Sequence, residues 1–208
     1  MFRRTSAIAA ALSLLALGSP LLTGCTNAWV KQYFDQAVEK FEEGNYQGAI
    51  ADLTTVIEMD PQDAVSYYNR GLAKSHIEDL QGAIADYNKA IEINPQYAEA
   101  FNNRGNIKTQ LKDYQGAIAD YNKALEIDPQ DDTTYYNRGN VKGELGDYQG
   151  AIADYNKALE IDPQGAFTYA NRGLAKKFGN DLLGACDDWR KAGDLGDERS
   201  AEWVKEQC

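Results

Sequence analysis

The chain has 208 residues, with 32 Asp plus Glu against 21 Lys plus Arg and a formal net charge of −11 at pH 7. Such a surface repels nucleic acid and anionic headgroups, which excludes both as electrostatic partners. His76 is the only histidine, and the sequence has no C-x-x-C motif, phosphate-binding loop or calcium-binding loop. We therefore expect a protein that is not an enzyme and that holds no metal and no cofactor.

The first 24 residues differ from the rest of the chain. Arg3 and Arg4 precede an uncharged run from Thr5 to Gly24, whose apolar centre is too short to cross a bilayer. A transmembrane anchor is the alternative interpretation, but Gly18-Ser19-Pro20 would interrupt a spanning helix. Residues 1–24 are therefore predicted to be a cleaved export signal.

The run ends in Leu22-Thr23-Gly24-Cys25, which resembles the lipobox of bacterial lipoproteins. The resemblance implies that Cys25 receives lipid and that residues 25–29 form a short tether. The protein is then expected in the bacterial cell envelope, anchored by lipid and facing the periplasm or the cell exterior. Thr26, in place of the aspartate that retains lipoproteins in the inner membrane of enteric bacteria, favours the outer membrane. The lipid alone should contact the membrane.

From Val30 onward the sequence repeats with a period of 34 residues. Asn-Arg-Gly recurs at residues 69–71, 103–105, 137–139 and 171–173. A fixed period of this size indicates one supersecondary unit copied in tandem. We divide this part of the chain into five units, 30–63, 64–97, 98–131, 132–165 and 166–199, followed by a polar capping helix at 200–208.

Each unit is predicted to be a pair of helices. In the unit 98–131, apolar and small residues follow helical spacing on both sides of a break at Lys112-Asp113. Pro129 ends the second helix. Gly105 in the first helix is expected to face Ala117 in the second, which would let the two backbones approach closely.

This pattern resembles the tetratricopeptide repeat over nearly the whole chain after the signal. The family's small and terminating residues are met at Gly71, Gly105, Gly139 and Gly173, at Ala83, Ala117 and Ala151, and at Pro61, Pro95, Pro129 and Pro163. The resemblance implies an all-α fold, a right-handed superhelical solenoid whose concave groove is lined mainly by first helices. The first unit departs from the pattern, with Gln36-Ala37 in place of Arg-Gly and Leu53 in place of an aromatic residue.

An arginine stands where the family usually has leucine, and an aspartate follows it sixteen residues later. The pairs are Arg70 and Asp86, Arg104 and Asp120, Arg138 and Asp154, and Arg172 and Asp188. Charges at the repeat period usually belong to the scaffold, so we interpret them as structural ion pairs within or between units. Ligand binding is the alternative.

An asparagine precedes each of these arginines and is expected to face the groove. A row of amides can donate to and accept from the backbone of an extended peptide. The positions are similar to the asparagine ladder in the tetratricopeptide superhelix of the O-linked N-acetylglucosamine transferases. The predicted groove residues are Asn69, Asn103, Asn137 and Asn171, with Asn102, Asn106, Asn140, Tyr68 and Tyr136 beside them. Alternatively, the amides bond the adjacent helix and the tyrosines pack between units.

Cys186 and Cys208 are the two cysteines left if Cys25 carries lipid, and an exported protein reaches an oxidising compartment. Cys186 lies early in the last second helix, and Cys208 ends the capping helix, which should run antiparallel to it. The two helices can retrace similar lengths, so we predict a disulfide. Two free thiols are the alternative.

Together these features predict a membrane-tethered adaptor that binds an extended segment of another exported protein in its groove. One alternative is an accessory factor that helps to assemble a pilus, an outer-membrane barrel or the cell-wall enzymes. Another is a structural oligomer in which the groove packs against a second copy.

Overall fold

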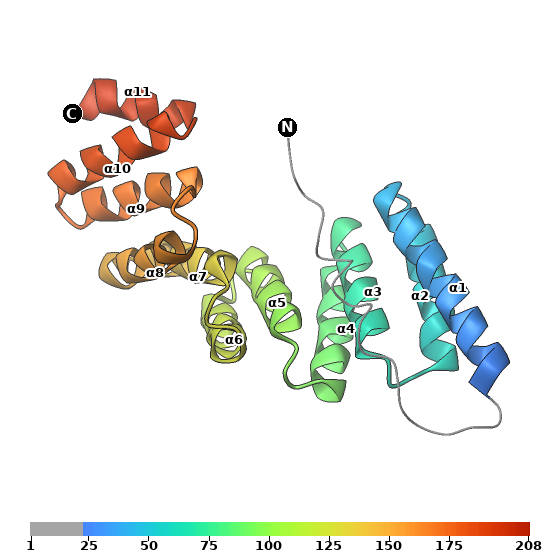
Figure 1. The fold of residues 1–208 in the computed structure, drawn as a ribbon. Helices are drawn as coiled ribbons and strands as arrows, with labels where there is room; N and C mark the ends of the chain where they lie inside the picture. The colour runs from blue at the N-terminus through green and yellow to red at the C-terminus, as the bar shows by residue number, and fades with distance from the viewer. Residues whose placement is uncertain (1–22) are drawn as a thin grey trace. The chain divides into compact units, whose positions relative to one another are not determined.

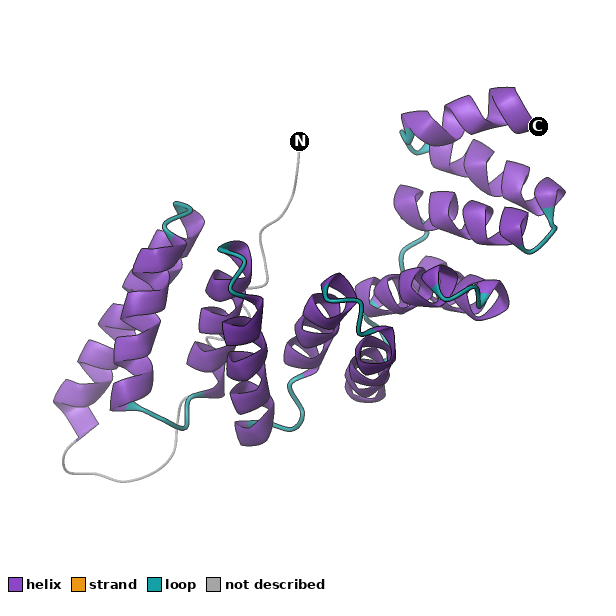
Figure 2. Ribbon diagram, turned by 180° about the vertical axis from the view of Figure 1, so that it is seen from behind, coloured by secondary structure: helices purple, strands orange, loops and turns teal. Residues whose placement is uncertain are grey.

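The computed structural model describes residues 23–208, with side chains from Ala28 onward, and this part of the chain contains eleven α-helices and no strand (Figure 2). The helices are α1 (Thr23–Glu42), α2 (Tyr46–Met59), α3 (Ala64–His76), α4 (Leu80–Ile93), α5 (Ala98–Gln110), α6 (Tyr114–Ile127), α7 (Asp132–Glu144), α8 (Tyr148–Ile161), α9 (Ala166–Phe178), α10 (Leu182–Asp194) and α11 (Glu198–Gln207). The predicted all-α fold is confirmed. Residues 1–22 of the expected signal and the side chain of Cys25 lie outside the described residues.

The helices belong to two compact units, one ending at Ala100 and the other beginning at Phe101 within α5. In the first unit, α1 packs on α2, α2 on α3, and α3 on α4 (Figure 1). In the second unit, each helix from α6 to α11 packs on the next one in the chain. Consecutive antiparallel helices therefore form the local architecture of both units.

A left-handed residue recurs in the turn between the two helices of each hairpin. Positive φ angles occur at Gly44, Glu78, Lys112, Gly146 and Asn180, which are spaced by 34 residues. Only two of the five are glycines, although this backbone region strains residues with a side chain. The same tight turn is thus made by five different local sequences.

The turn is completed by a cap on the second helix. In α8, the side chain of Asp147 accepts a hydrogen bond from the backbone N–H of Gly150 at 2.9 Å. The same bond is made by Asn45, Asp79, Asp113 and Asp181 to the glycine three residues later. An N-cap of this kind satisfies a backbone donor that the helix leaves unpaired. Prolines directly follow the C-cap residues of α2, α4, α6 and α8 and prevent the helices from continuing.

The close approach predicted at the repeat glycines is made to an aromatic ring rather than to alanine alone. A Cβ atom on Gly139 would lie 2.8 Å from the ring of Tyr155, which is only 3% exposed. Equivalent positions on Gly71, Gly105 and Gly173 would meet Tyr87, Tyr121 and Trp189. Ala117 and Ala151, which are fully buried, fill the space beside these rings. These four hairpins therefore exclude a side chain at the glycine so that an aromatic residue of the second helix fits.

This arrangement predicts opposite effects for two glycine substitutions in α7. Gly139→Ala should lower the free energy of unfolding by about 1–3 kcal/mol, because the new methyl group overlaps the ring of Tyr155. Gly143→Ala is the matched control, since nothing lies within 4 Å of its added Cβ. It should raise stability by up to about 1 kcal/mol through helix propensity. Urea unfolding followed by circular dichroism measures both, and equal effects would contradict the packing argument.

Candidate functional site

The candidate site is a line of amide and tyrosine side chains on the first helices of the second unit. Asn137 in α7 donates through Nδ2 to Asn102 Oδ1 in α5 at 3.2 Å. Asn171 in α9 donates through Nδ2 to the hydroxyl of Tyr136 at 3.0 Å and to Asn140 Oδ1 at 2.9 Å. The structure therefore brings together five of the predicted groove residues and links the repeats 132–165 and 166–199 each to the one before it.

Tyrosines of the second helices donate hydrogen bonds to the asparagines of this line. The hydroxyl of Tyr121 donates to Asn106 Oδ1 at 2.8 Å, and the hydroxyl of Tyr155 donates to Asn140 Oδ1 at 2.8 Å. Asn106 also lies 3.5 Å from the side-chain oxygen of Asn103. Burial raises the pKa of Tyr121 to about 12, so its hydroxyl stays protonated and able to donate at neutral pH. These bonds fix the amides, as the alternative interpretation of the asparagines expects.

The same amides nevertheless keep polar atoms that bond no other protein group. Within the described residues, Asn137 Oδ1, Asn140 Nδ2 and Asn171 Oδ1 have no protein hydrogen-bond partner. No buried side-chain nitrogen or oxygen lacks a partner in that part of the chain, so these three atoms are accessible. We call Asn137, Asn140 and Asn171 the amide row. It presents two acceptors and one donor to whatever lies against it.

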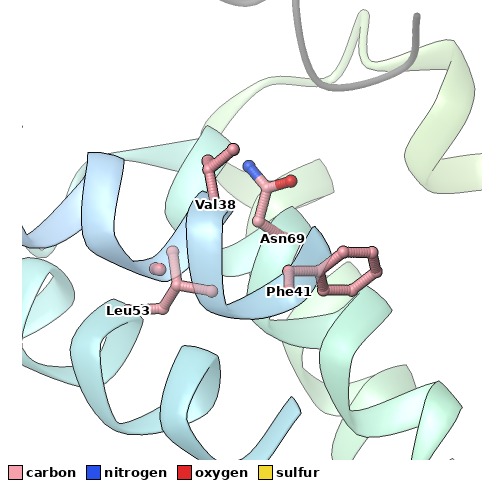
Figure 3. A pocket seen from close by; sticks show the side chains of 5 residues that line it. Val38, Phe41, Leu53 and Asn69 are labelled. Atoms are coloured by element: carbon pink, nitrogen blue, oxygen red, sulfur yellow. The ribbon is translucent and has the colours of Figure 1, made fainter. Parts of the chain in front are cut away.

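The first unit uses the equivalent positions differently. Asn69 donates to the backbone oxygen of Val65 in its own helix at 2.9 Å. It borders a cavity of about 10 Å³ with Val38, Phe41 and Leu53, large enough for only about one water molecule (Figure 3). The cavity arises because Leu53 occupies the position that holds an aromatic ring in the later repeats.

Tyr68, another predicted groove residue, is buried in the first unit. Its ring packs against the rings of Tyr97, at a centroid distance of 4.8 Å, and Tyr87, at 5.9 Å. It is 6% exposed, so it belongs to the packing of its unit, as the alternative interpretation of the tyrosines holds.

The repeated arginines and aspartates lie together, and a lysine completes each group. Asp154 in α8 accepts from Arg138 Nε at 2.9 Å through Oδ2 and from Nη2 at 2.6 Å through Oδ1, and Lys142 Nζ lies 2.8 Å from Oδ2. The equivalent groups are Arg70, Lys74 and Asp86, then Arg104, Lys108 and Asp120, then Arg172, Lys176 and Asp188. The first hairpin keeps only Lys40 with Asp52.

Sequence reasoning missed these lysines, although the signal was present. Lys74, Lys108, Lys142 and Lys176 recur at the repeat period, four residues after each arginine. Residues four apart on a helix lie on one face, so an arginine and a lysine at that spacing can reach the same carboxylate. In these four hairpins each buried carboxylate therefore contacts two cations rather than one.

Three of these arginines, Arg70, Arg138 and Arg172, also bond the preceding repeat. Arg138 Nη1 donates to Asn122 Oδ1 in α6 at 2.6 Å, and Arg172 Nη1 donates to Asn156 Oδ1 in α8 at 2.7 Å. Arg70 makes the corresponding bond to Thr54 in the first unit. Hydrogen bonding to Asp86 raises the pKa of Arg70 above its ordinary value. The guanidinium groups are thus held both within and between repeats.

Removal of one aspartate should destabilise the second unit strongly. Asp154→Ala leaves Arg138 and Lys142 without their carboxylate in a mostly buried position, which costs about 3 kcal/mol or more. Glu160→Ala is the control, because it removes the same charge from an exposed pair with Lys157. Its unfolding midpoint should hardly change. Similar midpoints for the two variants in thermal unfolding would show that the buried group is not structural.

The C-terminal end is closed by a disulfide. Cys186 in α10 and Cys208, the residue after α11, are joined, with their Cα atoms 5.9 Å apart. Trp189 in α10 and Trp203 in α11 pack together at a ring distance of 5.3 Å. The structure therefore joins the two predicted cysteines across the helix pair α10–α11.

The next features concern metal binding and membrane spanning by residues 23–208, the part of the chain that the structure describes. Among these residues, no group of three or more His, Cys, Asp or Glu side chains is placed to hold a metal ion. His76 stacks on Tyr46 at a ring distance of 4.4 Å. No helix within residues 23–208 is both long and apolar enough to cross a bilayer.

Family models match more than half of the chain. A model described as a TPR repeat matches residues 39–75, 78–111 and 105–146, and one described as a tetratricopeptide repeat matches residues 133–164. No curated protein sequence gives a significant match.

Solved structures share the fold at low sequence identity. MamA is 24% identical with a TM-score of 0.74, covering 85% of this chain and 96% of its own. YrrB, a TPR protein with an unusual peptide-binding site, is 19% identical with a TM-score of 0.72, covering 88% and 99%. The pilF protein of Pseudomonas aeruginosa is 18% identical with a TM-score of 0.75, covering 85% and 81%. These similarities confirm the predicted solenoid fold.

Proposed function

The chain belongs to the tetratricopeptide repeat family of protein-interaction scaffolds, and we propose that it binds an extended segment of another exported protein along the amide row, without catalysing a reaction. The accessible atoms of Asn137, Asn140 and Asn171 carry this proposal. They are held in place by bonds to their neighbours, so binding requires little further ordering of the amides.

The chemistry of the amide row matches a peptide backbone. An extended segment presents N–H and C=O groups along its length, and the row offers acceptors at Asn137 and Asn171 and a donor at Asn140. These contacts read the backbone rather than a particular side chain. The charged groups of the repeats do not compete, because each arginine and lysine described above is already paired with an aspartate.

The similar structures agree with binding of this type. YrrB is a TPR protein with an unusual peptide-binding site, and the match covers 88% of this chain. The identity is too low to transfer individual contacts, so the residues proposed here come from this chain alone.

We further propose that the protein is held at a membrane of the bacterial envelope by lipid on Cys25. The lipobox-like segment Leu22-Thr23-Gly24-Cys25 supports this proposal. A tether would raise the local concentration of the scaffold around partners that work at the same membrane. The outer membrane is favoured by Thr26.

The tether is tested by substitution of the lipidated residue. In a bacterial host supplied with labelled palmitate, the wild-type chain should incorporate label and fractionate with membranes. Cys25→Ser should lose both properties, while Cys208→Ser should keep them, since Cys208 is the partner of Cys186. Incorporation of label into the Cys25→Ser protein would contradict lipid attachment at Cys25.

Peptide binding is tested by a double substitution in the amide row. Asn137→Ala with Asn171→Ala removes two accessible acceptors and should weaken capture of a partner from solubilised envelopes by about thirtyfold, since two hydrogen bonds contribute about 1 kcal/mol each. Gln115→Ala with Gln149→Ala is the matched control, because these exposed amides lie on second helices.

The comparison is valid only if all three proteins melt alike, since Asn137 and Asn171 also join neighbouring repeats. Light scattering measures the molar mass of the wild-type protein in solution and so tests the remaining alternative, a self-associating oligomer. Equal capture by the amide-row variant and the control would contradict the proposal.

A further inference from the structure

An open surface pocket lies beside the amide row, in the second unit. It has a volume of about 350 Å³ and is lined by α7 residues Asp132, Thr133 and Tyr136, by Gln164 and Gly165 before α9, and by Ala166, Phe167 and Thr168 in α9. This volume is at the lower end of the range of ligand-binding pockets. Tyr136 connects it to the amide row, because its hydroxyl accepts a hydrogen bond from Asn171. We call it the Phe167 pocket.

One wall of the pocket is an exposed aromatic ring. Phe167 is 64% exposed, although large apolar side chains are usually covered. The second residue of the other repeat first helices, at Val65, Glu99 and Thr133, is not aromatic. The ring thus offers a flat surface that no other repeat provides, suited to an aliphatic stem or to a cation.

The charge of the pocket is negative. Asp132 lines it, and none of the eight lining residues is basic. Burial, followed by the nearby carboxylates of Asp131 and Asp162, raises the pKa of Asp132. Asp131 is occupied as the N-cap of α7, where it accepts from the backbone of Thr133 and the hydroxyl of Thr134. Asp132 is therefore the carboxylate available to an incoming cation.

We propose that the Phe167 pocket takes an arginine or lysine side chain of the segment bound along the amide row. The stem or guanidinium plane lies on the ring of Phe167, and the charged end meets Asp132. This assignment rests on the proposed function and deepens it: the amide row holds the backbone while the pocket selects a basic side chain. The net charge of −11 agrees with a basic partner.

The test uses two short peptides that differ only in charge. The peptide acetyl-Gly-Arg-Gly-amide and its citrulline counterpart have nearly the same shape, but citrulline is neutral. In an NMR titration of the purified protein, the arginine peptide should shift the amide signals of Thr133 and Phe167 and bind at least about threefold more tightly than the citrulline peptide. Equal affinity for the two peptides, or no shift with arginine, would overturn the proposal.

Variants locate the interaction. Asp132→Ala, which introduces the residue found at Ala98 and Ala166, and Phe167→Thr, which introduces the residue found at Thr133, should each weaken the arginine peptide by about threefold or more. Glu160→Gln removes a charge from the exposed pair with Lys157, outside the pocket, and should leave affinity unchanged. Unchanged affinity in the Asp132 and Phe167 variants also overturns the assignment.

The two proposals can fail separately. If partner capture depends on the amide row but not on Asp132 or Phe167, the pocket assignment is wrong and the proposed function stands. If the arginine peptide binds in the pocket while the amide-row variant captures the partner normally, the pocket stands and the backbone-reading role is wrong.

Discussion

The repeats depend on the ion pairs that the buried aspartate of each second helix makes with basic residues of the first helix. In the second unit, Asp154 receives one arginine and one lysine from the first helix of its own hairpin, and the same arginine bonds an asparagine of the preceding repeat. A charge taken out of water is costly unless its partners and hydrogen bonds are complete. The aspartate, the arginine and the lysine contact one another only in the packed hairpin. These contacts therefore specify which helix faces pair, and they also stabilise the pairing.

This use of charge shapes what the surface can recognise. The arginines and lysines of these repeats contact aspartates, so the surface proposed for recognition consists of the amide row, Tyr136 and the carboxylate of Asp132. Amides suit a peptide backbone, and the carboxylate of Asp132 beside Phe167 suits a cation. The proposed division between backbone reading and side-chain selection therefore follows from the scaffold's own use of its basic residues.

Much of the fold could be predicted from the sequence because its determinants are local and repeated. The 34-residue period, the prolines after four of the five second helices and the helical spacing of small residues give the hairpins directly. The ring that packs on each glycine could not be predicted in this way, because the contact of Tyr155 with Gly139 depends on the direction in which the tyrosine side chain points. The lysines recur visibly in the sequence, but which aspartate each one contacts depends on the packing of two helices.

The sequence by itself determined the repeat architecture, since periodicity places equivalent residues at equivalent positions. It also identified the candidate ion pairs and the amides that could line a groove. Only the tertiary structure decided how those residues are used. It buries Tyr68, bonds Asn69 to its own helix, and leaves atoms of Asn137 and Asn171 accessible. It also forms the Phe167 pocket from two neighbouring repeats, where three-dimensional proximity, rather than the repeat pattern, joins Asp132 to an aromatic wall.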